Sequence, residues 1–136
     1  MSDYRRWNEA PFFAWPGIRI VRAADGEAFV ELDVADHHRN GCEDGPVNGG
    51  IAAYLVDGLF GVCAHSARDE GVTGQVTMSI TVNYLRPLLA ARVVRAEARV
   101  VRAGRTAAYL AGELYGDGPE PCVSATGIYR YFRNER

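Results

Sequence analysis

Asp57 is the one charged side chain in a long apolar stretch of the chain. No other Asp, Glu, Lys or Arg occurs between Asp44 and Arg68. A buried carboxylate needs a partner, so the simplest interpretation is structural: one arginine or a set of backbone donors satisfies it. A carboxylate in such surroundings can also act as a general base or as a nucleophile. Asp57 is therefore the first candidate for a reactive side chain.

Gly49-Gly50, eight residues before Asp57, is the second candidate. If a helix begins here, its first backbone N–H groups lack intrahelical acceptors and carry partial positive charge. Such donors can hold a carbonyl oxygen on which negative charge develops in a transition state. The alternative is that the two glycines only ease a tight entry from loop to helix.

The spacing of these candidates predicts a site shared between two chains. Eight helical residues separate Gly49 from Asp57 by about 12 Å, so one carbonyl group cannot contact both within one chain. Two such helices, antiparallel across a twofold axis, would bring Asp57 of one chain to Gly49-Gly50 of the other. Small residues on the same helix face would permit this approach, namely Gly50, Ala53, Gly61 and Ala64. We therefore expect at least a homodimer.

The surrounding sequence predicts the elements that position the candidates. The stretch from Asn48 or Gly49 to about Arg68 predicts one long helix, apolar nearly all round, which other structure must wrap. Before it, residues 17–23 and 27–34 are β-compatible and are joined by Asp25-Gly26, a dipeptide typical of a tight hairpin. After it, residues 76–84, 94–100, 106–115 and 121–132 read as strands, with Gly127 breaking the alternation where a β-bulge would fit. These elements predict an α+β fold with an antiparallel sheet curled around the helix.

Composition limits the classes of function. The 136 residues fit one domain, residues 1–136, in which residues 1–16 form an N-terminal helical extension with an aromatic cluster at its end. The net charge of −2 is not the basic balance typical of nucleic-acid binding, and every one of the 15 basic residues is Arg. Glycines and Asp57 interrupt the apolar stretch, so we expect a buried helix and no membrane span. Three widely spaced cysteines and no apolar leader favour a cytoplasmic protein.

The loop before the helix contains Cys42 together with His37, His38 and Asp44. Cys42 lacks a recognisable activating histidine and lies beside acidic residues, so we do not interpret it as a nucleophile. The four side chains complete no standard metal motif, and no metal site is predicted.

Several of these positions together resemble a known family. Asn40, residues 46–50, Asp57 with Gly61, Val76-Thr77 and residues 83–87 are similar to the hotdog-fold acyl-CoA thioesterases of the PaaI-like (phenylacetic acid degradation) type, over residues 17–132. The resemblance implies a hotdog fold, a curved antiparallel sheet wrapped around one long central helix. It also implies hydrolysis of an acyl-CoA substrate with no cofactor, coenzyme A being part of the substrate, and assembly as a dimer or tetramer.

The resemblance also assigns roles. Gly49, with Gly50 beside it, would polarise the thioester carbonyl, Asp57 would act as nucleophile or general base, and Thr77 would help position water. Asn48 stands where the family usually has His, and we assign it to substrate binding. Asn40, nine residues before Gly49, is taken for the family's upstream Asn or Gln, as if the loop had gained two residues.

Coenzyme A carries phosphates, and arginine side chains are suited to bind them. Arg86, Arg102 and Arg105 lie near strand ends and are the candidates for phosphate binding. Arg95 and Arg99 alternate with buried positions, which is typical of a solvated strand face.

Two other functions fit the same fold. A non-catalytic acyl-CoA-binding protein is suggested by Asn48 in place of histidine. A hotdog hydratase or dehydratase is less favoured, because those enzymes generally depend on a catalytic His that this helix entry lacks. The acyl group is left open, aromatic or aliphatic.

Overall fold

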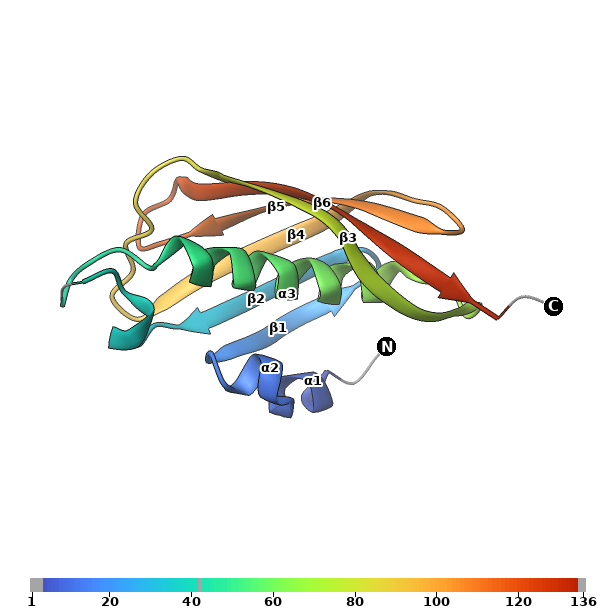
Figure 1. The fold of residues 1–136 in the computed structure, drawn as a ribbon, viewed down its shortest axis with the longest axis horizontal. Helices are drawn as coiled ribbons and strands as arrows, with labels where there is room; N and C mark the ends of the chain where they lie inside the picture. The colour runs from blue at the N-terminus through green and yellow to red at the C-terminus, as the bar shows by residue number, and fades with distance from the viewer. Residues whose placement is uncertain (1–3, 42, 135–136) are drawn as a thin grey trace.

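A computed structural model describes residues 4–41 and 43–134 of the chain. Within these residues, six antiparallel strands form one sheet in the order β1-β2-β4-β5-β6-β3, and helix α3 packs against its inner face (Figure 1). The elements are α1 (Arg5–Glu9), α2 (Pro11–Ala14), β1 (Ile18–Ala24), β2 (Glu27–Asp33), a 3-10 turn η1 (Asp36–His38), α3 (Gly49–Ala67), β3 (Val72–Tyr84), β4 (Val93–Ala103), β5 (Ala107–Tyr115) and β6 (Pro121–Arg133). The predicted α+β fold is confirmed.

The hairpin at Asp25-Gly26 forms as predicted and is fastened to the end of α3. Asp25 and Gly26 both have positive φ, 52° and 83°, as a two-residue turn with the twist of a hairpin requires. The Gly26 N–H donates to the Ser66 hydroxyl at 3.0 Å, and the Cys63 thiol donates to the Gly26 carbonyl at 3.3 Å. These bonds tie the β1–β2 pair to the helix.

Helix α3 is the centre of the hydrophobic core. One face carries the side chains that pack against the sheet, and these are Ala52, Leu55, Val56, Leu59, Phe60, Val62, Cys63 and Ala64. By length and composition α3 is also the one helix, among the described residues, that could cross a membrane. In this fold its apolar face is buried against the sheet, as the sequence predicted.

Phe60 fixes how closely the helix approaches the sheet. A Cβ at Gly127 in β6 would lie 2.6 Å from the Phe60 ring, and one at Gly112 in β5 would lie 3.0 Å from it. The two glycines therefore provide the space for a ring that is fully buried.

β6 has no bulge at Gly127, so that prediction was wrong, and one of the bulges in the sheet lies instead in its neighbour β3. Thr77 pairs with Tyr129 and Ser79 pairs with Ile128, which leaves Met78 as the extra residue. Gly127 itself stays in regular register with Leu110 of β5. Its role is to admit Phe60, which a single sequence does not reveal.

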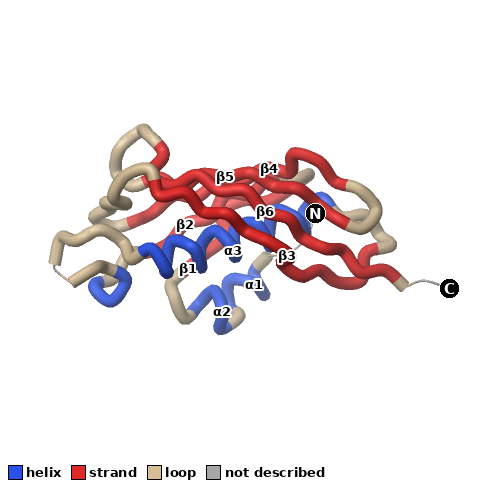
Figure 2. Tube along the Cα trace, turned by 45° about the horizontal axis from the view of Figure 1, so that its top comes forward, coloured by secondary structure: helices blue, strands red, loops and turns tan. Residues whose placement is uncertain are grey.

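The N-terminal segment, helices α1 and α2, lies beside β1 and against α3 (Figure 2). The Asn8 side chain accepts a hydrogen bond from the Ile20 N–H of edge strand β1 at 2.7 Å. Phe13 is fully buried and its ring packs on Gly58, where a Cβ would come within 2.9 Å. Of the expected aromatic cluster only Phe13 is buried, since Phe12 is 49% and Trp15 73% exposed.

The packing of Phe60 gives a stability prediction. Gly127→Ala places a methyl group in the space that the Phe60 ring occupies. The variant should therefore lower the free energy of unfolding by about 1–3 kcal/mol, the usual cost of overpacking. Gly118→Ala is the control, because nothing lies within 4 Å of a Cβ there. Urea unfolding of the two variants measures the difference, and equal stabilities would contradict the packing role of Gly127.

Candidate active site

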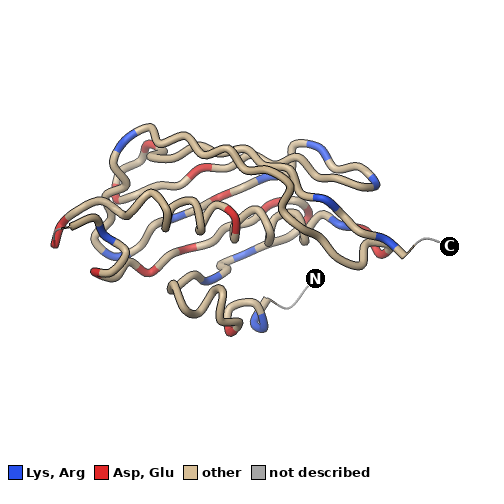
Figure 3. The backbone as a smooth tube through the Cα atoms, in the orientation of Figure 1, with Lys and Arg blue, Asp and Glu red and all other residues tan. Residues whose placement is uncertain are grey.

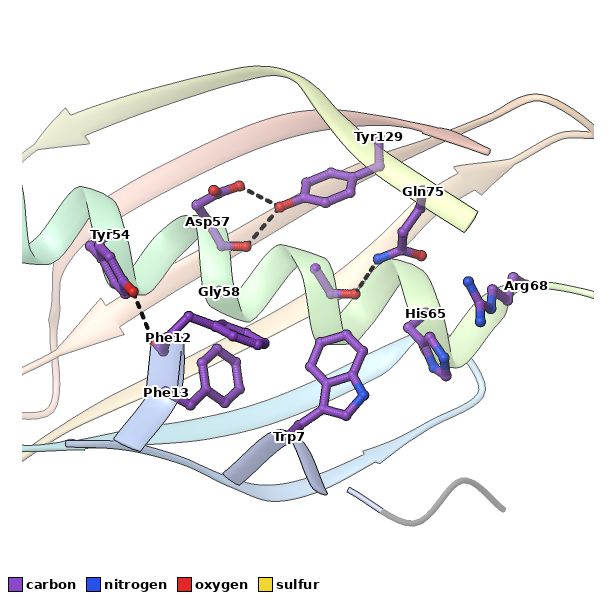
Figure 4. Close-up of a pocket in the computed structure, with 11 residues that line it drawn as sticks. Trp7, Phe12, Phe13, Tyr54, Asp57, Gly58, His65, Arg68, Gln75 and Tyr129 are labelled. Atoms are coloured by element: carbon purple, nitrogen blue, oxygen red, sulfur yellow. Dashed lines mark hydrogen bonds between the residues drawn. The ribbon is translucent and has the colours of Figure 1, made fainter. Parts of the chain in front are cut away.

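The Asp57 carboxylate accepts hydrogen bonds from two different strands. The Thr77 hydroxyl of β3 donates to Asp57 Oδ1 at 2.7 Å. The Tyr129 hydroxyl of β6 also donates to Oδ1, and lies 2.7 Å from the Asp57 carbonyl oxygen (Figure 4). Among the described residues nothing donates to Oδ2. One carboxylate oxygen is thus held and the other is available.

The Met78 bulge explains how Thr77 reaches the helix. Before the bulge, Gln75 and Thr77 face α3, and the Gln75 amide donates to the Gly61 carbonyl at 2.7 Å. After it the parity changes, so that Tyr84 faces α3 and its hydroxyl donates to the Gly49 carbonyl at 2.6 Å. The extra residue therefore lets one strand contact the helix both at Asp57 and at its start.

Tyr129 is a site residue that sequence analysis missed. It is 4% exposed. Burial, followed by its hydrogen bond to Asp57, raises the pKa of Tyr129 well above its usual range. The hydroxyl therefore keeps its proton and acts as a donor to the carboxylate. The available signal was a tyrosine at an inward-facing position of β6, since a buried hydroxyl requires a partner.

At the start of α3, Asn48 connects two of the predicted residues. Its Oδ1 accepts from the Gly50 N–H at 2.7 Å, which is the bond of a helix N-cap. Its amide Nδ2 donates to Asn40 Oδ1 at 2.7 Å. The Gly49 N–H donates to no acceptor among the described residues. Gly50 is thus occupied by the cap, whereas the Gly49 N–H stays available.

The preceding loop is held by its own backbone and by one arginine. The Asn48 N–H donates to the His38 carbonyl at 2.7 Å. Arg39 donates to the carbonyls of Gly45 and Ala90 at 3.1 and 2.9 Å. His38 is buried, and its Nδ1 accepts from the Ala35 N–H at 2.9 Å. Burial lowers the pKa of His38, so the imidazole is neutral at neutral pH.

The two halves of the predicted site lie apart in one chain. Gly49 and Asp57 are on the same regular helix, so about 12 Å of helix separates them. Of the four small residues expected on the face of Asp57, Ala64 is fully buried and Gly61 faces the Tyr129 ring. Gly50 is exposed, and Ala53 and Gly61 are both partly accessible.

The predicted phosphate-binding arginines lie at different ends of α3. Figure 3 shows basic residues spread over the chain and not gathered in one patch. Arg86 follows β3 near the start of α3 and forms an ion pair with Glu120 at 2.7 Å. Arg102 and Arg105 lie at the β4–β5 turn, and Arg105 shares a pocket with Arg68 at the end of α3. Because a 19-residue helix is about 28 Å long, the three do not form one cluster.

Arg95 and Arg99 are exposed, and both form hydrogen bonds within the chain. The Arg95 guanidinium donates to the carbonyls of Gly116 and Gly118 at 3.2 and 3.1 Å. Arg99 pairs with Glu113 at 3.0 Å. Cys42 lies outside the described residues, and within the described residues no three His, Cys, Asp or Glu side chains come together as a metal site would require.

Comparison with known proteins gives consistent matches. A family model described as the thioesterase superfamily matches residues 44–123. A protein of Halobacterium salinarum named as an esterase is 31% identical over 127 residues, covering 88% of this chain and 83% of the relative. Human acyl-coenzyme A thioesterase 13 is 29% identical over 97 residues, covering 71% of this chain and 66% of the relative.

Among solved structures, the phenylacetic acid degradation protein PaaI from Thermus thermophilus superposes with a TM-score of 0.77 at 27% identity, over 90% of this chain and 100% of that one. The family model alone spans more than half of the chain. The α+β architecture is that of the hotdog fold, and the chain belongs to the thioesterase superfamily, with PaaI proteins among its structural relatives.

Proposed function

We propose that this protein is an acyl-CoA thioesterase that hydrolyses the thioester to a free acid and coenzyme A, with each active site shared across a dimer interface. The observation that carries the proposal is the state of the Asp57 carboxylate. Thr77 and Tyr129 hold Oδ1, while Oδ2 accepts no hydrogen bond from the described residues. A fixed carboxylate with one open oxygen is what attack on a carbonyl requires.

Asp57 Oδ2 acts on the thioester carbon in one of two ways. It takes a proton from a water molecule whose oxygen attacks the carbon, or it attacks directly and forms a mixed anhydride that water then hydrolyses. In both routes the C–S bond breaks and coenzyme A leaves as the thiol. Heavy-oxygen water in a single turnover tests direct attack, because Asp57 gains the label only when water opens an anhydride at the Asp57 carbonyl. Trapping the anhydride itself detects direct attack when water opens it at the acyl carbon instead.

The carbonyl oxygen is held by a backbone donor at the start of a helix. Asn48 already occupies the Gly50 N–H, so we assign this role to Gly49. Asn48 serves as the cap and as the link to Asn40. This assignment explains how the chain does without the usual histidine, since the donor is a backbone group next to it.

The Gly49 that serves a given Asp57 belongs to the partner subunit. Strand β3 is an edge of the sheet, and its outer face presents Val76 and Met78, 48% and 59% exposed. An edge strand with exposed apolar side chains favours pairing with a second copy. Asp57 is hydrogen-bonded to this same strand, so pairing here places it at the interface. Further assembly to a tetramer is part of the proposal.

The remaining features of the proposal follow from the substrate. The proposed hydrolysis uses only a carboxylate, a backbone donor and water, so it needs no metal or redox cofactor. Coenzyme A enters as part of the substrate. We propose that Arg86, Arg102 and Arg105 bind the phosphates of coenzyme A. Because Arg86 is far from the other two within one chain, one coenzyme A molecule contacts either Arg86 or the pair Arg102 and Arg105 of a given chain. We place the protein in the cytoplasm.

The first prediction concerns Asp57→Asn. The amide keeps an Oδ1 acceptor for Thr77 and Tyr129 and replaces the open oxygen by NH₂, so folding should be retained. Turnover of acyl-CoA, measured by release of free thiol, should fall by about a hundredfold or more, as for loss of a positioned base or nucleophile. Unchanged turnover would disprove the proposed role of Asp57.

The second prediction concerns Tyr129→Phe, which removes one donor from Asp57 Oδ1. A less restrained carboxylate should reduce kcat by about ten- to a hundredfold with little change in KM. Tyr131→Phe is the matched control, because Tyr131 is also buried in β6 but donates to the Ala64 carbonyl at 2.6 Å. A similar loss of kcat in both variants would mean that Tyr129 acts only through stability.

The third prediction tests the shared site. Asp57→Ala and Gly49→Pro should each be inactive, and mixed dimers of the two should recover about half of the wild-type activity, because one of two sites then has both groups. Proline suits the first helical position, where it removes the N–H and adds a ring whose Cβ would lie 3.5 Å from the Tyr84 ring, an ordinary contact. Asn48 already has the extended backbone that precedes proline, φ −58° and ψ 140°.

Mass spectrometry confirms that the mixed dimers form. Inactive heterodimers would show that the site is not shared in this way. If the wild-type protein binds acyl-CoA without turnover, the non-catalytic alternative holds. Hydration of an enoyl-CoA without thiol release would instead identify the hydratase.

A further inference from the structure

A groove of about 610 Å³ leads from Asp57 along α3 toward the end of the helix. Its floor is formed by Gly61, which has no side chain, and by Gly58, on which the Phe13 ring packs. One wall is formed by Gln75 and Tyr129 from the sheet. The other wall is aromatic and belongs to the N-terminal segment, with Trp7, Phe12 and Phe13 (Figure 4).

The aromatic wall comes from outside the region that matches the family model, which begins at residue 44. It is nevertheless fastened to the site. The Tyr54 hydroxyl donates to the Phe12 carbonyl at 2.7 Å. The Trp7 ring lies 6.0 Å from the Phe13 ring and 5.2 Å from the His65 ring, centroid to centroid. The segment is therefore a fixed part of the groove in this chain.

The contact between Trp7 and His65 narrows the groove at a defined distance from the reactive carboxylate. His65 follows Asp57 by eight residues, or about 12 Å along the helix. Burial lowers the pKa of His65, so its ring is uncharged at neutral pH, and its Nδ1 is buried without a hydrogen-bond partner among the described residues. Arg68 also lines this end of the groove.

We propose that the acyl group of the substrate lies in this groove and that Trp7 sets the acyl length the enzyme accepts. The inference rests on the proposed function, because it takes the thioester carbon to be at Asp57. The groove then receives apolar acyl chains up to the Trp7–His65 contact and disfavours longer ones. Specificity for acyl length then resides in the N-terminal segment and not in the central helix or the sheet.

The test compares kcat/KM for acetyl-CoA, hexanoyl-CoA and decanoyl-CoA. Trp7→Ala should raise the decanoyl-to-acetyl ratio by about tenfold or more, as expected when an apolar pocket gains room for added methylenes. Trp15→Ala is the control, since Trp15 is on the same segment but 73% exposed and outside the groove. That variant should leave the ratio unchanged.

A second variant makes the groove smaller. A Cβ at Gly61 would lie 3.6 Å from the Tyr129 hydroxyl oxygen, an ordinary contact, so Gly61→Ala should fold. Its methyl group occupies the floor and should lower the hexanoyl-to-acetyl ratio by about tenfold. This variant tests the inference even if Trp7→Ala is unstable.

Binding separates failure of the inference from failure of the proposed function. In Asp57→Asn, calorimetric Kd values for the same acyl-CoAs should depend on acyl length as kcat/KM does, and adding Trp7→Ala should shift this dependence toward the longer acyl groups. Length-dependent binding in a protein that hydrolyses none of these thioesters would reject hydrolysis and keep the acyl groove. Active variants whose decanoyl-to-acetyl and hexanoyl-to-acetyl ratios are unchanged would overturn the inference. So would an equal change of KM for all three substrates, because that result would place the pantetheine arm of coenzyme A in the groove instead of the acyl group.

Discussion

The site depends on satisfying a single carboxylate in the middle of an apolar helix. Asp57 is half-buried between apolar neighbours on α3, and its buried oxygen needs donors from the protein. Thr77 from β3 and Tyr129 from β6 supply them. These hydrogen bonds hold α3 to the edge of the sheet formed by β6 and β3. They leave the other oxygen of Asp57 open. Stability and the proposed chemistry thus share one arrangement.

The close approach of helix and sheet follows from positions that lack side chains. Gly127 and Gly112 admit the Phe60 ring, and Gly58 admits Phe13. The first contact sets the depth of α3 against the sheet, and the second brings the N-terminal segment up to Asp57. The glycines in and around α3 therefore shape the active-site groove as much as the residues that line it.

Local sequence signals predicted the elements well, because each has a local physical cause. Asp25-Gly26 supplies positive φ for its turn, and the apolar stretch that begins at Gly49 forms α3. The bulge at Met78 and the donor Tyr129 were not predicted, because both depend on which strands become neighbours. Thr77 reaches Asp57 through that bulge, so a strict alternation could not place it. Phe12 and Phe13 were candidates for lining an acyl pocket, but the place of Trp7 in the N-terminal wall was not predicted, since that wall forms only when distant segments pack.

The central claim is that Asp57 of one chain and Gly49 of the partner subunit act on one carbonyl group. The most direct measurement is a crystal structure of the Asp57→Asn variant with an acyl-CoA analogue in which a ketone replaces the thioester. We predict that the ketone oxygen accepts a hydrogen bond from the partner subunit's Gly49 while its carbon faces the substituted side chain. A ketone oxygen bound within the same chain as position 57, or an analogue bound away from that position, would contradict the account.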